Sequence, residues 1–396
     1  MGNRKALSEV FRPVGPKLIT SGIPWSSGGS ASILQQVDLS LPIRGIRLVF
    51  KGRLVVGTAA FTSTNPEGLL NLISNVTIQG TNSRQKGNVT LWNIDLATAF
   101  VLQHLYAYRN GIFTINSGSG ETLVPIPTMP FPAVGATGYI NGATGTMDFR
   151  IVVDFPFHPH EANAQGKQPM VVPGFLVRNE EWKDSLQILL TFGAQAGNST
   201  GALGVAAATT TVTFSSYGSG AGSPTIDLYS LPIAMGLDLK DTVIPGLISR
   251  VSTPINTPLQ SAGTSVPLVN LQKQPTPRLY AKFGTGTVSP AFATLSDVNV
   301  TTLGLLLGGN RNVRNKVDIF AHKNQQPDVY DRDPIQGYNM MDFLDSGNPD
   351  SSYPGQDIGD GATFQVVGDV AGVANGFGLV VQEQMLHMPT GPMFTF

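Results

Sequence analysis

The chain has 396 residues, of which 41% are hydrophobic and only 13% are charged, with a formal net charge of −1 and no cysteine. This composition excludes a disordered chain, a disulfide scaffold, thiolate metal sites and cysteine nucleophiles. The balanced charge provides no overall field that would recruit nucleic acid or an anionic membrane. No apolar run approaches the roughly 18 residues of a membrane span, and no secretory signal is expected at the N-terminus.

Residues 1–35 are predicted to form an arm that is peripheral to the folded part of the chain. Three prolines interrupt regular structure, and residues 26–30 (SSGGS) have the composition of a linker. Four basic residues against the single acidic Glu9 make the segment locally positive. We expect a solvated or partner-bound terminus, and the alternative is contact with an anionic surface such as a membrane or nucleic acid.

A β-strand pattern begins after this arm and leads into the clearest helix of the chain. Residues 33–41 and 46–58 alternate apolar with polar side chains, as half-buried strands do. Strands are also predicted at 72–79 and 88–92, with turn residues at 80–83 between them.

One strand and one helix of this stretch carry specific side-chain predictions. The predicted strand 72–79 has one mostly apolar and one mostly polar face. We expect Leu72, Val76 and Ile78 to point into the core, and Ile73, Asn75 and Thr77 to point outward. Asp95 is placed to cap a helix that runs to Arg109 and ends at Gly111.

The rest of the first half alternates uncharged loops with strands. Residues 111–145 and 193–222 are rich in small and polar residues and are predicted to be long surface loops, the second with an internal strand (TTTVTF). Strands are predicted at 146–157, within 182–192 and at 225–231.

The second half is predicted to repeat this plan without repeating the sequence. A helix is expected from the N-cap Asp333 and from Pro334, which suits a first helical position, to Leu344. Strands are predicted at 277–283, 296–307, 316–320, 363–367 and 376–385, with a turn at 308–312 and loops between the others.

These two halves predict an all-β chain of two sandwiches with roughly eight strands each. The boundaries are an arm at 1–35, a first sandwich at 36–238 and a second at 239–396. One large barrel is an alternative, whereas a propeller would need shorter and more numerous repeats.

The layout resembles the double jelly-roll major capsid proteins of tectivirus-like, membrane-containing icosahedral bacteriophages. The resemblance lies in residues 71–108, 145–158 and 376–388. It implies two jelly rolls side by side, three copies in a pseudo-hexagonal capsomer, and neighbouring capsomers as partners. It also implies outer towers built by the two long loops, and an N-terminal arm near the viral membrane and minor capsid or vertex proteins.

No residue is predicted to be catalytic, cofactor-binding or metal-binding. His158, His160 and Glu161 lack a further ligand at a motif spacing and are expected to form the turn after a strand. An Asp-rich stretch lacks the spacing of a Ca²⁺ loop and is expected to be solvated. Its members are Asp328, Asp331, Asp333, Asp345, Asp350, Asp357 and Asp360. The resembling family has no catalytic residues to transfer, so a non-enzymatic shell protein without cofactor is expected.

Two other classes of function stay open at this point. A spike or receptor- or carbohydrate-binding sandwich would use aromatic platforms, yet the chain has only three tryptophans. A jelly-roll enzyme acting on glycans would need paired carboxylates in a groove. The leading expectation is a homotrimeric major capsid protein in the virion, made in the host cytoplasm, with no specific nucleic-acid partner.

Overall fold

In the computed structural model of the protein, the described residues lie mostly in β-strands, with few helices. It describes residues 11–33, 37–56, 67–105, 112–116, 121–123, 145–157, 176–183, 185–193, 212–235, 246–255, 259–272, 274–285, 294–307, 311–330, 334–342 and 364–387. Within these ranges no helix combines the length and the apolarity that crossing a membrane would need.

The described residues of the first half include two short helical segments and one longer helix among the strands. In chain order these elements are β1 (Phe11–Pro13), β2 (Lys17–Pro24), β3 (Ser30–Ile33), β4 (Ile43–Val56), the 3-10 helix η1 (Gly68–Leu72), β5 (Ile73–Asn82), β6 (Gly87–Ile94), α2 (Leu96–Leu105), β7 (Ile112–Asn116), β8 (Glu121–Leu123), β9 (Gly145–Pro156), α3 (Asn179–Trp182), β10 (Gln187–Phe192), β11 (Val212–Ser215) and β12 (Thr225–Met235).

Among the described residues of the second half there is one helix. The elements of this half are β13 (Leu247–Pro254), β14 (Gly263–Leu271), β15 (Arg278–Thr285), β16 (Thr294–Leu295), β17 (Val300–Leu307), β18 (Arg311–Asp318), α5 (Ile319–Tyr330), β19 (Tyr338–Asp342), β20 (Phe364–Val370) and β21 (Gly376–His387).

Both halves pair their strands in the same order. In the first half, β2-β12-β4-β9 form one set of neighbours and β3-β10-β5-β6 the other. In the second half, β13-β21-β15-β19 and β14-β20-β17-β18 repeat this arrangement. Counting these strands along each half, the first, eighth, third and sixth form one sheet, and the second, seventh, fourth and fifth form the other. This is the jelly-roll topology, so the chain contains two jelly rolls.

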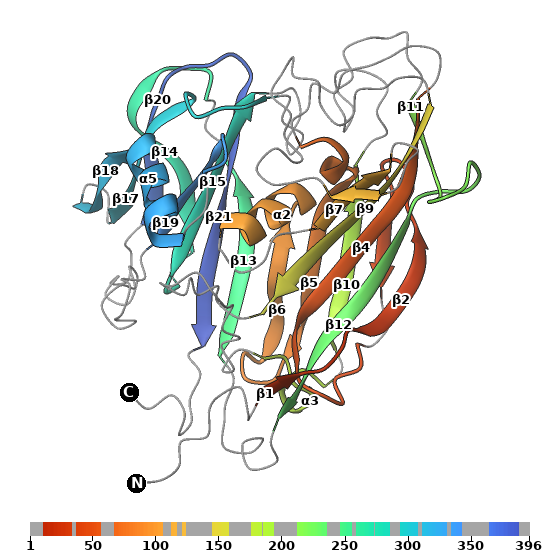
Figure 1. Cartoon of the computed structure of the whole chain (residues 1–396). Coiled ribbons are helices and arrows are strands. Elements are labelled where there is room, and N and C mark those ends of the chain that lie inside the picture. Colours follow the sequence, from red (N-terminus) through yellow and green to blue (C-terminus); the bar gives the residue numbers. More distant parts are fainter. Residues whose placement is uncertain are drawn as a thin grey trace.

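The two rolls share one sheet. A 9-stranded sheet runs from β16 to β3 and includes strands of both rolls, while an 8-stranded sheet completes the first roll and a 4-stranded sheet the second. Figure 1 shows the rolls side by side, with β18 on one outer side and β2 and β12 on the other. The only backbone pairing between strands of different rolls, among the described residues, is the parallel pairing of β6 with β13.

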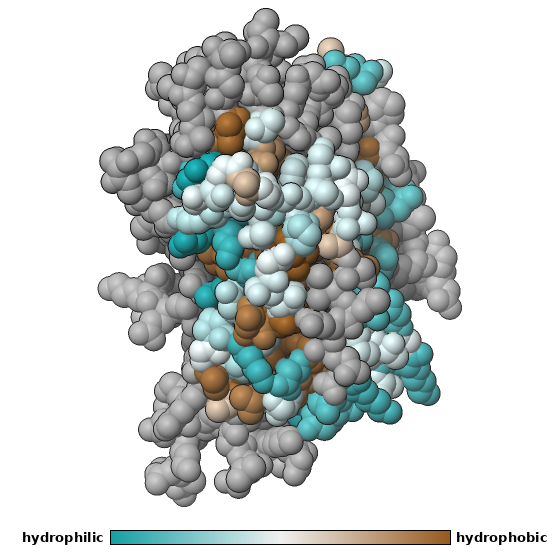
Figure 2. Space-filling model, turned by 90° about the vertical axis from the view of Figure 1, so that its right-hand side faces the viewer, coloured by the Kyte–Doolittle hydropathy of each residue, from teal (hydrophilic) through white to brown (hydrophobic). Residues whose placement is uncertain are grey.

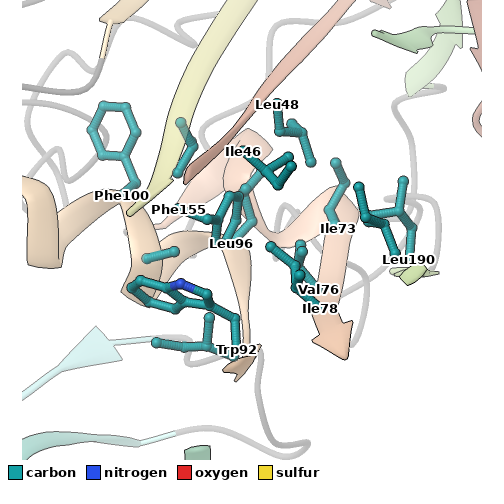
Figure 3. Packing of buried hydrophobic residues seen from close by; sticks show 14 of the residues in the cluster. Ile46, Leu48, Ile73, Val76, Ile78, Trp92, Leu96, Phe100, Phe155 and Leu190 are labelled. Carbon is teal, nitrogen blue, oxygen red and sulfur yellow. The ribbon is translucent and has the colours of Figure 1, made fainter. Parts of the chain in front are cut away.

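Each roll has its own apolar core between its two sheets. Figure 3 shows part of the first core, where Ile46 and Leu48 of β4, Trp92 of β6 and Phe155 of β9 come together with Leu96 and Phe100 of α2. The second core lies between the sheets that contain β15 and β17, with Phe283 and Leu305 fully buried. Such burial of alternating side chains is the main source of stability of each sandwich.

Truncating Ile78 to alanine should lower the free energy of unfolding by about 2–5 kcal/mol, the usual cost of a cavity at a buried aliphatic site. Ile78 lies on β5 and has no exposed surface. The truncation Val298→Ala is the control, because Val298 is 60% exposed and a surface change of this kind costs within about 0.5 kcal/mol. Denaturant unfolding measures both, and equal effects at the two positions would contradict the placement of Ile78.

The prediction that the N-terminal 35 residues lie outside the fold is wrong for the strands of this segment. β2 pairs with β12 over most of its length, and β3 pairs with β10. Trp25 is 4% exposed, and its indole nitrogen donates a hydrogen bond to the carbonyl of Leu72 at 2.7 Å. The proline- and glycine-rich composition therefore marks the ends of strands that complete the first roll.

Ile73 points into the core, not outward as the alternation predicted. Val76 and Ile78 are buried as expected, but so is Ile73. Opposite β10, Thr191 faces Asn75 while the next residue, Phe192, faces Ile73. Ser74 is the extra residue of a β-bulge, which reverses the alternation beyond it and lets both Leu72 and Ile73 face inward.

The first predicted helix is confirmed as α2 over Leu96–Leu105, and its predicted continuation to Arg109 lies outside the described residues. The second predicted helix, 334–344, is wrong, because Tyr338–Asp342 is β19 and pairs with β15. Gly337 before it has φ +79°, which ends any helix there. A helix described in this half, α5, lies instead inside the region predicted as a strand and a loop.

Candidate functional site at the junction of the two jelly rolls

The backbone junction between the rolls consists of β6 and β13. Arg250 lies opposite Trp92 and Val251 opposite Asn93 in a parallel register. The hydroxyl of Ser252 donates to the carbonyl of Asn93 at 3.0 Å. Parallel pairing of strands from different rolls makes one continuous sheet, so the rolls are connected by backbone as well as by side chains.

Helix α2 fills the space between the rolls. It lies between strands of the two rolls in Figure 1, and residues 96–103 are all buried. Its N-terminus is capped by Asp95, whose Oδ2 accepts hydrogen bonds from the backbone nitrogen and the hydroxyl of Thr98 at 3.0 and 2.8 Å. A helix that is apolar around its whole circumference is stable only when it is covered on all sides.

The sheet β13-β21-β15-β19 of the second roll is therefore covered on both faces. Leu279 and Phe283 of β15 point into the core of the second roll, whereas Tyr280, between them in sequence, belongs to the apolar cluster of the first roll. Tyr338 and Met340 of β19 also join the first cluster. The outer face of this sheet thus continues the core of the first roll.

A buried arginine fastens the junction at β13. Arg250 has no exposed side-chain surface, and its Nε donates to Oε2 of Glu383, which is equally buried, at 2.9 Å. Its terminal nitrogen donates to the carbonyl of Pro156 at 3.1 Å, and its guanidinium lies 4.6 Å from the centre of the Trp92 ring. Arg250 therefore ties β21 of its own roll to β6 and β9 of the other.

A second buried group of charges lies between η1, the start of α2 and the second roll. Lys282 of β15 contacts Oε1 of Glu67 at 2.5 Å and Oδ2 of Asp95 at 3.2 Å. The hydroxyl of Tyr338 donates to Oε1 of Glu67, also at 2.5 Å. Burial raises the pKa of Glu67 above its usual value, while the charge of Lys282 opposes this shift. We infer that this cluster fixes the orientation of the rolls, since each partner loses a buried counter-charge if the rolls separate.

The metal ligands considered from the sequence fall almost entirely outside the described residues. His158, His160, Glu161 and all aspartates of the Asp-rich stretch except Asp328 lie outside the described residues, and Asp328 falls in α5 without a described side chain. In the described part of the chain, no three histidine, aspartate or glutamate side chains are grouped as a metal ion would require.

Sequence reasoning missed the residues of the junction, apart from the helix cap Asp95. No strand was predicted for residues 247–254, although Leu247, Ile248 and Val251 are apolar and β-prone. Isolated charged residues in apolar strands, such as Arg250 in β13 and Lys282 in β15, were the available signal. A charge in such a position is retained only with a buried partner.

The topology and the shared sheet define the double jelly-roll fold. The chain is similar in structure to the MCP of STIV, at 14% identity and a TM-score of 0.54, with 97% of each chain covered. It is also similar to a chain in the atomic structure of Sulfolobus Turreted Icosahedral Virus, at 12% identity and a TM-score of 0.55, covering 96% of this chain and 90% of the other. PBCV-1 VP54 matches at 13% identity and a TM-score of 0.55, covering 99% and 97%. Neither a protein-family profile nor a curated protein matches the sequence.

Proposed function

We propose that the protein is a major capsid protein that forms pseudo-hexagonal homotrimeric capsomers of an icosahedral shell around an internal membrane. The observation that carries this proposal is the pair of jelly rolls with one topology, locked together by β6, β13 and the buried charges. Three such chains around one axis present six similar β-units. The structurally similar chains include one in a viral particle and one, from PBCV-1, in a virus capsid.

The composition supports a protein that is surrounded by copies of itself. Charged residues are 13% of the chain, against roughly a quarter in an average soluble protein. Permanent interfaces between subunits bury large areas and are depleted of charge.

The proposal includes the virion as the location, synthesis in the host cytoplasm and a bacteriophage source. It also includes contacts of the N-terminal residues before β1 with the viral membrane or with minor capsid or vertex proteins.

The burial of the tryptophans argues against the alternative of a carbohydrate-binding spike. Trp25, Trp92 and Trp182 are 4%, 2% and 0% exposed, so none offers a stacking surface to a sugar. The burial of the paired carboxylates Glu67 and Asp95 argues against an enzyme that acts on glycans. Glu67 and Asp95 contact the same Lys282 and are buried between the rolls, where a glycan has no access.

Size-exclusion chromatography coupled to light scattering should give the purified protein a molar mass of about three times the chain mass of 41.9 kDa. Three double jelly rolls should give pseudo-hexagonal particles in negative-stain images of the same sample. Head-to-tail contacts between the first roll of one copy and the second roll of the next would close such a ring. A stable single chain at micromolar concentration would contradict the capsomer.

A further inference from the structure

Each roll places a helix directly after its fifth strand, and of the side chains that the structure describes on these two helices, exposed ones occur only on the helix of the second roll. In the first roll, Asp95 and α2 follow β6; in the second, α5 follows β18, which ends at Asp318. Asp318 Oδ1 accepts a hydrogen bond from the backbone nitrogen of Phe320 at 2.8 Å, so it caps α5 as Asp95 caps α2. The described side chains of α2 are all buried, whereas Phe320 on α5 is 58% exposed.

The edge strands of the two rolls differ in the same way, since one pair of edges is joined within the chain and the equivalent pair is not. Within the chain, β6 pairs with β13, which is the first strand of the other roll. The counterparts of these strands are β18 and β2, and in the described strands β18 pairs only with β17 and β2 only with β12. They lie on opposite outer sides of the molecule in Figure 1. One copy therefore offers both halves of a junction that it cannot form with itself.

The side of the first roll that carries β2 has exposed apolar surface. Leu18 on β2 is 51% exposed and Val14, just before it, is 42% exposed. Figure 2 views the molecule from this side and shows an apolar area between polar ones. Large apolar side chains that remain exposed together commonly mark a contact surface.

We propose that α5 and β18 of one copy pack against β2 and the outer face of β2-β12-β4-β9 of the next copy, and so repeat between copies the junction that α2, β6 and the second roll form within one chain. This inference rests on the proposed capsomer and specifies which surfaces meet in it. Phe320 contributes the apolar contact of the helix, and β18 approaches β2 as β6 approaches β13. The contact is head-to-tail and closes after three copies.

The polarity of the two surfaces fits a junction that forms after folding. The outer face of the first roll carries three cross-strand ion pairs, Arg47–Asp154, Lys51–Asp227 and Arg53–Asp148, at 2.6, 2.6 and 2.7 Å. α5 is correspondingly polar, with the sequence IFAHKNQQPDVY. Helix α2 at the junction within one chain becomes buried on folding and is mostly apolar, whereas surfaces that must stay soluble before assembly are more polar.

Charge also matches across the proposed contact. Oδ2 of Asp95 forms an ion pair with Nζ of Lys282, which lies on β15 of the second roll, at 3.2 Å. In the first roll the strand equivalent to β15 is β4, and its outer face offers Lys51, whose side chain is 33% exposed. Asp318, which is exposed, is the equivalent of Asp95 and would meet this basic strand. Such pairs set the register of a contact more than its affinity.

Cross-linking between different single-cysteine variants tests which surfaces meet. The chain has no cysteine, so Asn324→Cys on α5 and Leu18→Cys on β2 each introduce one unique thiol. The two variants are co-expressed and treated with a bis-maleimide that spans about 10 Å, the spacing of packed elements. The mixture should give covalent dimers, and each variant alone should give none, because a head-to-tail contact brings α5 to β2 and not to another α5.

Trimers of the co-expressed variants that yield no cross-linked dimers would overturn the proposed surfaces and leave the capsomer intact. Dimers from Asn324→Cys alone would also overturn them, since they indicate a two-fold contact between helices. A wild-type protein with the mass of a single chain would overturn the capsomer and the contact together.

The variant Phe320→Glu provides a second test by placing a charge in the proposed contact. It should shift the mass from three chains to one at micromolar concentration, with an unchanged circular dichroism spectrum because Phe320 is 58% exposed. Gln260→Glu adds the same charge to the same roll next to β14, at the opposite edge of the sheet from β18, and should remain trimeric. A trimeric Phe320→Glu protein would contradict the role of α5.

Discussion

Replacing Arg250 with methionine should lower the free energy of unfolding by about 3–5 kcal/mol, as expected when one partner of a buried ion pair is removed. Among the described residues, Glu383 would then keep its buried charge with Arg278 as its remaining cationic neighbour, at 3.9 Å. The carbonyl of Pro156 would lose the hydrogen bond from Arg250, and the Trp92 ring its stacked cation. Urea unfolding at a fixed protein concentration measures the change, because association raises the apparent stability.

Arg250→Lys is the matched control for this prediction. Lysine keeps the positive charge near Glu383 but lacks the planar fork that reaches Glu383 and Pro156 together and stacks on Trp92. It should therefore recover part of the loss and not all of it. A loss below about 1 kcal/mol for Arg250→Met, which is the range of surface ion pairs, would mean that the pair does not hold the rolls together.

Replacing Lys282 with methionine should have a similar effect, about 3–5 kcal/mol at neutral pH, because two buried carboxylates would share no cation. Burial already raises the pKa of Glu67, and loss of the lysine charge would raise it further. A carboxylate with a raised pKa in the folded state takes up its proton at a higher pH than in the unfolded chain. The penalty should therefore be greatest at neutral pH and shrink as the pH falls through the raised pKa toward 4.5, the ordinary value of glutamate.

The pH profile of this variant separates its electrostatic effect from simple loss of packing. Lys17→Met is the control, because the side chains of Lys17 and its partner Asp38 are 55% and 48% exposed. That exposed pair should contribute little to stability. A Lys282→Met penalty that is independent of pH between neutral and acidic conditions would contradict a charged cluster at the junction.

The fold was predictable where local patterns and tertiary structure agree. The strands β5, β6, β9, β12, β15 and β21 lie where strands were predicted, and Asp95 caps α2 as its position indicated. The pattern failed at Ile73, because a bulge at Ser74 depends on the partner strand β10 and has no local signal. It failed again at Tyr338–Asp342, where pairing with β15 determines a strand in a sequence that also suits a helix.

The junction was hardest to predict because its members are far apart in sequence. Glu67 and Tyr338 are 271 residues apart, and Arg250 and Glu383 are 133 apart. Nothing in the neighbourhood of either residue specifies its partner. The helix α5 was missed for a different reason, since its mixture of polar residues lacks the apolar stripe by which a packed helix is recognised.

In the proposed capsid, the continuous sheet would affect how the shell can curve. Bending one copy between its rolls would break the pairing of β6 with β13 and separate Lys282 from Glu67 and Asp95. The two rolls of each copy should therefore move together as one rigid body. The change of angle from a flat facet to the edge between facets would then fall on the contacts between capsomers, and its sharpness would depend on how far those contacts can tilt.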